Sequence, residues 1–389
     1  MTERFDCAVC GGHRLEEVRT FERLPRITSD CKPFAPGGRL VECLECGATQ
    51  KVPSARWLEE IGRIYDAYVP YHQAEGVEQI VLDSETGTLR RRSEVIVSRL
   101  RARAVLPPAG SALDVGCGSG ATLKVLSREF PRWRLFGLEL DHRNHAHLSA
   151  IPNLERVYAG SHAEIDHAFD LVTSIHSLEH FPSPSNVLHS LRAKVADRGH
   201  LFLQLPNTAE NPFDLVVADH LLHFSPRTAV RIAERAGFHV ESVATAWVPK
   251  EISLLAQPGA HPRGALRGAQ HDEFGVGRAG VDWLFSVIED AAACARQSRS
   301  FGIFGTSISA TWLAGSLPGK VSFFVDEDAQ RQNRDYMGRP VVSPDRIPAG
   351  STVFLALAPL VQANVRRRLA PLAINFAGPR PVPGSLRPD

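Results

Sequence analysis

A glycine-rich segment near residue 115 carries the residues best suited to bind a cofactor. It reads Leu113-Asp114-Val115-Gly116-Cys117-Gly118-Ser119-Gly120, and Glu139 ends the next apolar stretch. Glycines allow a tight turn and let a ligand touch the backbone. Asp114 would repel a pyrophosphate but suits the ammonium end of S-adenosylmethionine, and Glu139 can bind both hydroxyls of a ribose. The segment therefore predicts an S-adenosylmethionine site. A dinucleotide site, because the glycines also fit G-x-G-x-x-A, and a purely structural turn are the alternatives.

Four of the seven cysteines form two matched pairs, Cys7-Ala8-Val9-Cys10-Gly11 and Cys43-Leu44-Glu45-Cys46-Gly47. Each C-x-x-C turn brings two thiolates within reach of one ion, and the glycine relieves crowding in the turn. A site of four thiolates leaves no open position for a substrate, so the pattern predicts a structural Zn²⁺ held by Cys7, Cys10, Cys43 and Cys46. Unligated thiols and a redox C-x-x-C are the alternatives, but a redox motif is expected once, beside a βαβ unit.

Alternating strands and helices between residues 112 and 248 must position the glycine turn. Strands are expected at 112–115, 134–139, 169–174 and 200–205. Because helical segments separate them, the spacing predicts a parallel α/β sheet with helices on both faces. A helix is also expected over 89–106, ended by Pro107-Pro108, with the arginines of 90–92 on a solvated face.

A second α/β unit follows, with strands near 301–305, 321–326 and 352–357. Its Gly302-Ile303-Phe304-Gly305-Thr306-Ser307 segment could hold a phosphate at a helix N-terminus. A degenerate Rossmann-like fold that helps to shape a substrate cleft is the favoured interpretation, since clefts commonly form between domains.

Several motifs of the central region together resemble those of class I S-adenosylmethionine-dependent methyltransferases. They are the D-x-G-x-G-x-G segment, Gly137-Leu138-Glu139, Phe169-Asp170-Leu171-Val172 and Leu178-Glu179-His180. The resemblance covers residues 112–240 and implies that Glu139 binds the ribose and that Ser161 lies near the adenine, where many members carry Asp. It also implies that His176 borders the transferred methyl group. The methionine end would be lined by Asp114, Gly116, Gly118 and Gly120.

The order of zinc knuckles, methyltransferase core and second α/β unit resembles the sugar-nucleotide C-methyltransferases of branched deoxysugar biosynthesis. Those enzymes carry a Glu-His pair followed by an aromatic-Phe-Ser stretch, and this chain reads Asp219-His220-Leu221-Leu222-His223-Phe224-Ser225. The resemblance implies that His220 is the general base, that Asp219 is its carboxylate partner and that His223 replaces a Tyr. Tyr71 would match a tyrosine near the substrate.

The chemistry is consistent with these roles. A histidine can remove a proton beside a ketone near neutral pH, a carboxylate can orient its ring, and Tyr or His can donate to the enolate oxygen. The pair Glu179-His180 is a rival, ranked second.

A chain of 389 residues predicts two to three domains of about 150 residues each. We expect an α/β protein with a zinc-binding module and substrate-side segment at 1–80. A Rossmann-like methyltransferase core at 81–255 and a linker at 256–280 would follow. A smaller Rossmann-like α/β domain at 281–376 and a disordered tail at 377–389 would complete the chain.

Composition restricts the partners. Lys and Arg number 44 and Asp and Glu 43, so the chain lacks the basic excess of a nucleic-acid binder. The start, MTERFDCAVC, lacks the apolar stretch of a signal peptide, and no apolar run reaches the roughly 18 residues of a membrane span. We therefore expect a soluble, cytoplasmic protein without nucleic-acid or membrane partners.

The predicted function is methyl transfer from S-adenosyl-L-methionine to a carbon atom of a small-molecule substrate, a keto-deoxysugar nucleotide. Oxygen or nitrogen methylation of another small metabolite is the nearest alternative. A nicotinamide-dependent oxidoreductase, which Asp114 disfavours, and a zinc-module binding protein without catalysis are the others.

Overall fold

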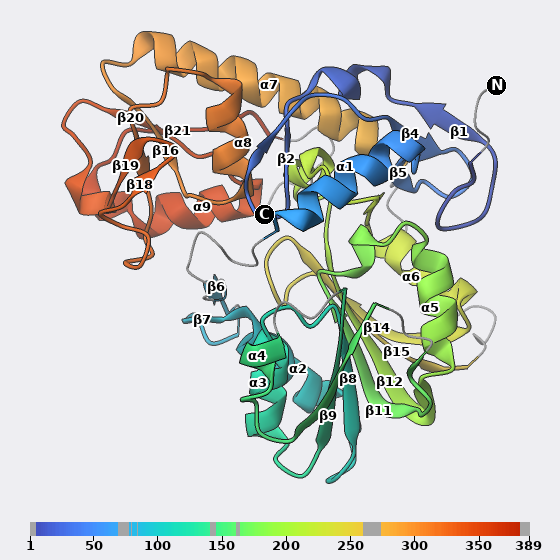
Figure 1. Ribbon diagram of the computed structural model, residues 1–389. Helices are drawn as coiled ribbons and strands as arrows, with labels where there is room; N and C mark the ends of the chain where they lie inside the picture. Colours follow the sequence, from blue (N-terminus) through green and yellow to red (C-terminus); the bar gives the residue numbers. More distant parts are fainter. Residues whose placement is uncertain are drawn as a thin grey trace.

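The computed structural model describes residues 5–68, 78, 80–83, 85–140, 145–160, 164–259 and 274–381. A seven-stranded sheet with the order β10-β9-β8-β11-β12-β15-β14 forms the lower part of the molecule in Figure 1, and N-terminal and C-terminal elements lie side by side above it. Its strands are β8 (Ser111–Val115), β9 (Arg134–Glu139), β10 (Leu154–Ala159), β11 (Phe169–Ile175), β12 (Val195–Pro206), β14 (Phe238–Ala244) and β15 (Glu251–Pro258).

Alternate residues of these strands face opposite layers of helices, as the two-residue repeat of a strand requires. Leu113 and Val172 pack with α5 (Pro184–Arg192) and α6 (Pro226–Arg235), whereas Ala112 and Leu171 pack with α2 (Arg92–Arg103) and α3 (Ala121–Glu129). The predicted α/β class with helices on both faces is confirmed, and so are the four predicted strands. A wholly parallel sheet was the wrong expectation, because β15 runs antiparallel between β12 and β14. Short η4 (Leu178–His180), η5 (Pro212–Val216) and α4 (His145–Leu148) complete this region.

The predicted helix over 89–106 begins later than expected. Residues of β7 (Leu89–Arg91) pair with β6 (Ile80–Leu82), so their backbone is extended, and α2 starts only at Arg92. Arg91 is exposed, as predicted, but Arg90 and Arg92 do not form a solvated face. Arg90 pairs with buried Asp83 at 2.8 Å, and Arg92 is 9% exposed and forms an ion pair with Glu251. A charge run at a helix start thus holds buried carboxylates.

The N-terminal region forms a four-stranded sheet with the order β1-β4-β5-β13. Its last strand, β13 (Leu222–His223), comes from the segment after the central strand β12 and pairs antiparallel with β5. The N-terminal region is therefore joined to the central domain by backbone hydrogen bonds. Its elements are β1 (Leu15–Glu17), η1 (Arg19–Arg23), β2 (Arg26–Ile27), β3 (Pro33–Phe34), β4 (Leu40–Cys43), β5 (Thr49–Lys51) and α1 (Ala55–Asp66).

The C-terminal region is a six-stranded sheet with the order β18-β19-β17-β16-β20-β21, parallel except at β18. The long helix α7 lies across the top of the view in Figure 1 and reaches from this region over the N-terminal one. The elements are α7 (Val276–Gln297), β16 (Phe301–Phe304), α8 (Ile308–Ser316), β17 (Phe323–Val325), β18 (Asp335–Tyr336), β19 (Arg339–Val342), η6 (Pro344–Arg346), β20 (Thr352–Phe354), α9 (Pro359–Arg368), η7 (Ala370–Leu372) and β21 (Phe376–Ala377).

Two expectations for the segments around this region need correction. The linker predicted at 256–280 is shorter, since 256–258 end β15 and 276–280 begin α7; residues 260–273 lie outside the described residues. The tail predicted to be disordered from 377 is ordered at its start. Ala377 belongs to β21, and the Arg380 carbonyl accepts a hydrogen bond from Trp283 Nε1 at 2.7 Å. Residues 382–389 lie outside the described part.

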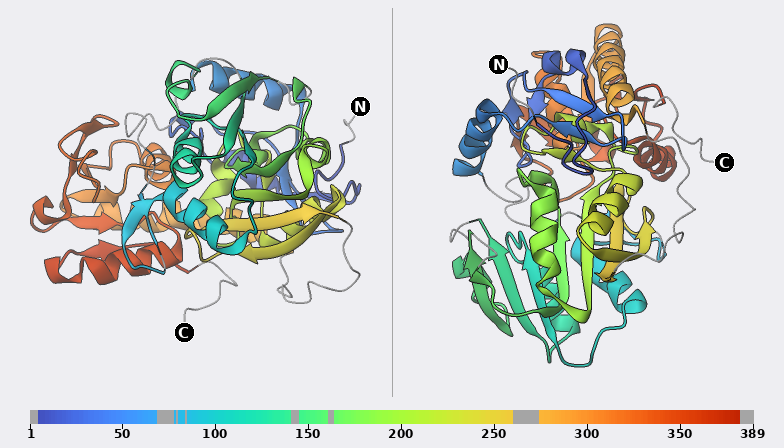
Figure 2. Two further views of the ribbon diagram at one scale, coloured as in Figure 1. Left: turned by 90° about the horizontal axis from the view of Figure 1, so that it is seen from below. Right: turned by 90° about the vertical axis from the view of Figure 1, so that its right-hand side faces the viewer.

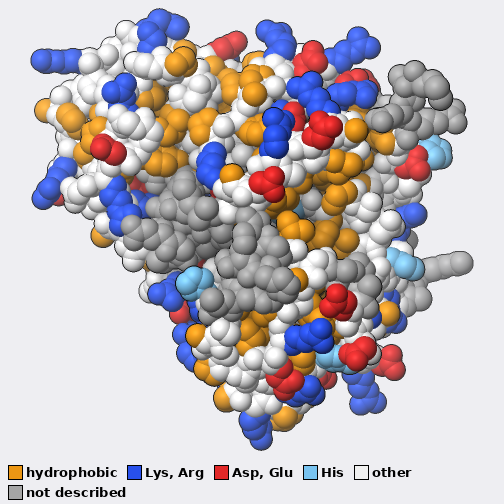
Figure 3. Space-filling view, in the orientation of Figure 1, with side chains coloured by type: hydrophobic (Ala, Val, Ile, Leu, Met, Phe, Trp, Pro, Cys, Tyr) orange, Lys and Arg blue, Asp and Glu red, His pale blue; other side chains and the backbone are white. Residues whose placement is uncertain are grey.

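The N-terminal and C-terminal regions share one apolar core. It includes Phe21, Phe213, Trp283 and Trp312, and Trp312 Nε1 donates to the Pro25 carbonyl at 2.7 Å. Figure 2 shows the two regions stacked on the same side of the central sheet. On the face in Figure 3, basic and acidic side chains are interspersed over much of the described surface. None of the helices within the described residues is long and apolar enough to span a bilayer.

Candidate active site

The predicted glycine turn lies at the carboxyl ends of β8 and β9, between β8 and α3, where open α/β sheets bind ligands. Gly116 has a φ of +75°, and a Cβ there would lie 2.5 Å from Cβ of Ser177. Gly120 has a φ of +76°, and a Cβ would lie 2.5 Å from the Leu148 side chain. Both positions therefore require glycine. Gly118, also left-handed at +51°, borders open space.

Two carboxylates face this turn from neighbouring strands. Asp114 is 2% exposed and accepts a hydrogen bond from Thr173 Oγ1 at 2.6 Å. Burial raises the pKa of Asp114 to about 7, against the opposing effect of the Thr173 hydrogen bond. Glu139 accepts from the Gly118 amide at 2.7 Å. A buried carboxylate with one neutral partner suits a ligand with an ammonium group, and the half-buried Gly118 borders open space, so the residues present fit S-adenosylmethionine. Ser161 lies outside the described residues.

The four knuckle cysteines come together at one point. Sγ of Cys7 lies 3.5 Å from Sγ of Cys46, and Sγ of Cys10 lies 3.6 Å from Sγ of Cys43. All four sulfur atoms lie within 4.8 Å of one another. In a tetrahedral zinc site with bonds of about 2.3 Å, sulfur atoms are separated by roughly 3.8 Å, so the cluster fits the ion. Both knuckle glycines, Gly11 and Gly47, have positive φ, as the motif predicts.

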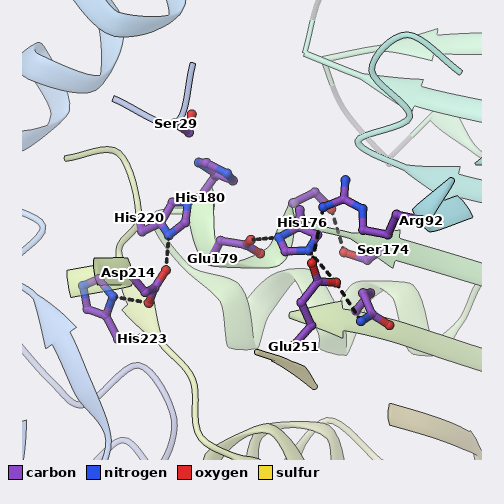
Figure 4. A network of polar contacts seen from close by, with 12 residues as sticks. Ser29, Arg92, Ser174, His176, Glu179, His180, Asp214, His220, His223 and Glu251 are labelled. Carbon is purple, nitrogen blue, oxygen red and sulfur yellow. Dashed lines mark hydrogen bonds and ion pairs between the residues drawn. The ribbon is translucent and has the colours of Figure 1, made fainter. Parts of the chain in front are cut away.

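A row of histidine–carboxylate contacts runs from the end of β11 toward the N-terminal region (Figure 4). His176 directly follows the last residue of β11 and has a φ of +49°. Its ring lies 3.0 Å from Glu251 Oε2 and 3.4 Å from Glu179 Oε1. Burial alone would lower the pKa of His176, but Glu251 and Glu179 together outweigh it and the pKa rises to about 9. His176 is thus a cation between two buried carboxylates.

His220 is brought into this row, but its carboxylate partner differs from the predicted one. Nδ1 of His220 lies 2.7 Å from Oδ1 of Asp214, and Asp214 is fully enclosed. Asp219 instead accepts hydrogen bonds from the amide and hydroxyl of Ser29 and pairs with His180 Nδ1 at 3.2 Å. The predicted pairing of His220 with Asp219 is therefore wrong. Adjacent residues in this extended loop point to different sides, so neighbours in sequence face different partners.

His223 does not have the predicted role of a donor to the substrate oxygen. Its side chain is buried, Nδ1 contacts Asp214 at 2.7 Å, and Nε2 contacts Lys51 Nζ at 3.1 Å. Both ring nitrogens are used inside the protein. Tyr71, the other predicted donor, lies outside the described residues.

The rival pair Glu179-His180 lies beside His220. The rings of His180 and His220 meet edge to face, with centroids 4.5 Å apart, and Glu179 is fully buried next to His176. The structure thus places both predicted pairs in one cluster. Sequence reasoning missed Lys51 and Glu251, which are distant in sequence from the histidines they contact, and Ser29, which is distant from Asp219. It also missed Asp214, only six residues before His220, because the adjacent Asp219 was the more obvious partner.

The predicted phosphate turn of the C-terminal region is occupied by its own side chains. Thr306 Oγ1 donates to Asp326 Oδ2 at 2.8 Å, and Arg331 Nη1 donates to Thr306 Oγ1 at 3.1 Å. Asp326 also accepts from the amide of Asp328. These contacts support the interpretation of a Rossmann-like unit without a phosphate site.

Comparison with known proteins then identifies the central region. Residues 89–243 match the family described as "Methyltransferase domain". This region is a class I S-adenosylmethionine-dependent methyltransferase domain. The matched residues include the glycine turn, Asp114, Glu139 and the histidines of the row. Glu251, the cysteine cluster and the second α/β unit lie outside them.

The methyltransferase domain also resembles individual proteins. Ubiquinone biosynthesis O-methyltransferase of Photorhabdus laumondii is 32% identical over 125 residues, which cover 30% of this chain and 51% of that protein. The enzyme of the same name from Proteus mirabilis is 26% identical over 176 residues, covering 41% and 71%. The chain spans about half the length of most of the curated relatives it matches. A solved S-adenosylmethionine-dependent methyltransferase from Mesorhizobium loti is 17% identical, with a TM-score of 0.35, and covers 42% of this chain and 97% of that one.

Proposed function

We propose that this chain transfers the methyl group of S-adenosylmethionine to an oxygen atom of a small metabolite, with His220 as the general base. The observation that carries the proposal is the buried His220–Asp214 contact in the histidine row of the methyltransferase domain. The named activity of the relatives, O-methylation in ubiquinone biosynthesis, favours oxygen over the carbon atom predicted from the sequence. The screen described below identifies the acceptor.

Each residue of the row has a separate task in this proposal. The bound donor supplies a methyl group already activated by its sulfonium. His220 Nε2 would take the hydroxyl proton of the acceptor while the acceptor oxygen gains the methyl carbon, whose bond to the sulfonium sulfur breaks to leave a neutral thioether. Asp214 stabilises the imidazolium that results, since it hydrogen-bonds the other ring nitrogen. Asp114 and Glu139 bind the donor, and the N-terminal region excludes water from the acceptor side.

Carbon methylation of a keto-deoxysugar nucleotide is the second candidate. It is favoured by the cysteine cluster and the second α/β unit, because this order of regions resembles that of the sugar-nucleotide C-methyltransferases. Both regions lie outside the residues matched by the methyltransferase family. In that reaction, His220 would remove the proton next to a ketone. We also propose that the four cysteines hold a structural Zn²⁺, because their sulfur atoms form a closed set at metal-binding distances.

A donor carrying a deuterated methyl group tests the proposal. The purified protein is incubated with it and a metabolite extract, and products that gain the labelled methyl are found by mass spectrometry and located by NMR. A methyl group on oxygen supports the proposal, and one on carbon supports the second candidate. If His220→Asn methylates the same acceptor at the wild-type rate, the base assignment is overturned.

A further inference from the structure

A buried chain of polar groups contacts Nδ1 of His220. It runs from Asp214 through His223 to Lys51, and Figure 4 shows the first two contacts. Asp214 is 3% exposed, His223 2% and Lys51 0%. Burying three ionisable groups without function is costly, so the arrangement of their protons is informative.

Asp214 fixes the proton positions on both rings. Burial favours its neutral form, but the rings of His223 and His220 outweigh this and hold the pKa of Asp214 well below its usual range. An ionised carboxylate only accepts hydrogen bonds. Its Oδ1 faces Nδ1 of His220 and its Oδ2 faces Nδ1 of His223, each at 2.7 Å. Both Nδ1 atoms must therefore carry hydrogen.

Lys51 completes the chain from the N-terminal region. Its Nζ lies 2.6 Å from the Val217 carbonyl, 2.8 Å from the His220 carbonyl and 3.1 Å from His223 Nε2. These are three acceptors for the three hydrogens of an ammonium group. Burial lowers the pKa of Lys51 to about 7, and burial, with the Lys51 charge, lowers that of His223 to about 4. Because the pKa of His223 lies below that of Lys51, His223 is neutral throughout the pH range in which Lys51 gains its proton, and its Nε2 accepts from Lys51 Nζ.

These contacts determine which ring nitrogen of His220 can accept a proton. With hydrogen on Nδ1, its Nε2 holds a lone pair whenever the ring is neutral. Within the described part of the chain, Nε2 has no hydrogen-bond partner. Nε2 is thus the one ring atom able to accept a proton from an acceptor molecule.

We propose that Asp214, His223 and Lys51 are positioning residues that hold His220 as the Nδ1–H tautomer and thereby make Nε2 the basic atom. The proposal rests on the proposed function for its catalytic meaning, but the tautomer itself is a property of the resting protein. It also gives the N-terminal region a task beyond metal binding, because Lys51 follows the second cysteine knuckle in β5.

The tautomers are measured directly by ¹⁵N NMR of the full chain labelled at histidine, at a pH of about 7.5, where an ordinary histidine is mostly neutral. The His220→Asn and His223→Asn variants assign the two signals. We expect hydrogen on Nδ1 of both rings. Hydrogen on Nε2 of His220 in the wild-type protein overturns the proposal without any need for a variant to fold.

Asp214→Asn tests the first link. The amide of Asn can donate to Nδ1, so we expect the His220 hydrogen to move to Nε2 and turnover to fall by roughly 10²–10⁴-fold, with donor affinity unchanged. Asp219→Asn is the matched control, because Asp219 contacts Ser29 and His180 and not His220. It should leave the His220 tautomer as in wild type. A His220 tautomer that Asp214→Asn leaves unchanged contradicts the proposal.

Lys51→Met tests the second link. Without the neighbouring ammonium, His223 should become protonated at a higher pH than in wild type, which its ¹⁵N signals report. Met keeps the unbranched apolar stem of Lys, so the burial that also lowers the pKa of His223 is retained in this variant. If His223 titrates as in wild type, Lys51 is not one of the positioning residues. If the tautomers are as expected but His220→Asn turns over at the wild-type rate, the positioning proposal is supported and the proposed base is wrong.

Discussion

At the scale of single residues, the site depends on which group each histidine contacts. His220 and His180 are close in space, yet one pairs with Asp214 and the other with Asp219. Only His220 has a fully buried carboxylate that also holds a second ring. This difference makes His220, rather than His180, the expected base.

His220→Asn should keep donor binding but lower turnover by roughly 10²–10⁴-fold, because Asn cannot accept the proton. Single-turnover assays and calorimetry with S-adenosylhomocysteine measure the two effects separately. His189→Asn, an exposed position on α5, is the control and should behave as wild type. If His180→Asn causes the larger loss, the two histidines exchange roles.

Donor binding should strengthen as pH rises from about 5.5 toward about 7.5. The pKa of Asp114 is raised to about 7 by burial, so below this value the donor-free protein must release a proton before the carboxylate can meet an ammonium group. Affinity should rise by up to about tenfold per pH unit below the pKa and level off above it. Calorimetry with S-adenosylhomocysteine measures this. Asp114→Asn should bind more weakly and without the pH dependence, and an unchanged dependence would contradict the assignment.

At the scale of elements, buried ion pairs join strands and helices that are distant in sequence. Glu251 at the start of β15 contacts His176 after β11 and Arg92 at the start of α2. His176 chiefly, with burial opposing, lowers the pKa of Glu251 to about 2. The edge of the sheet beside the glycine turn is thus fixed by charge as well as by packing.

This contact makes stability depend on pH in a defined direction. The folded-state pKa of His176, about 9, exceeds its ordinary value of 6.5. The contribution of His176 to the free energy of unfolding is therefore complete below a pH of about 6.5 and is lost as the pH rises through about 9. His176→Asn should lower the free energy of unfolding by up to about 3 kcal/mol near pH 6 and by much less near pH 9.5. Denaturant titrations at both values measure it, and an equal loss at the two values would sink the idea.

At the scale of the whole molecule, the N-terminal region packs against the segment that carries His220. Its β5 pairs with β13, Trp57 Nε1 donates to the Ala218 carbonyl at 3.1 Å, and Ser29 binds Asp219. The loop that carries His220 is therefore held by a region that the methyltransferase family match does not include. The shared apolar core links the C-terminal region to the same structure.

Zinc removal should therefore affect turnover more than donor binding. Elemental analysis should find one zinc per chain, and the Cys43→Ser/Cys46→Ser variant should lose it, since the four sulfur atoms form one site. We expect a lower melting temperature and a loss of turnover of tenfold or more, with S-adenosylhomocysteine still bound. Cys294→Ser, a cysteine of α7 outside the cluster, is the control. Undamaged protein without zinc would refute the metal site.

Local sequence determined the parts of this protein that depend on spacing along the chain. The glycine turn, the carboxylates at two strand ends and the two C-x-x-C knuckles could be predicted, because a few adjacent residues impose their geometry. The strands at residues 112–115 and 134–139 could be predicted from short runs of mostly apolar residues. Tertiary structure alone decided that β15 runs antiparallel, that Arg92 is buried against Glu251, and that Asp214 rather than Asp219 holds His220. It also brought Lys51 beneath the same loop. Most of these contacts join segments separated by a strand or a whole region, whereas Asp214 and His220 are only six residues apart. In both cases no local pattern encodes which polar group will satisfy another once both are buried.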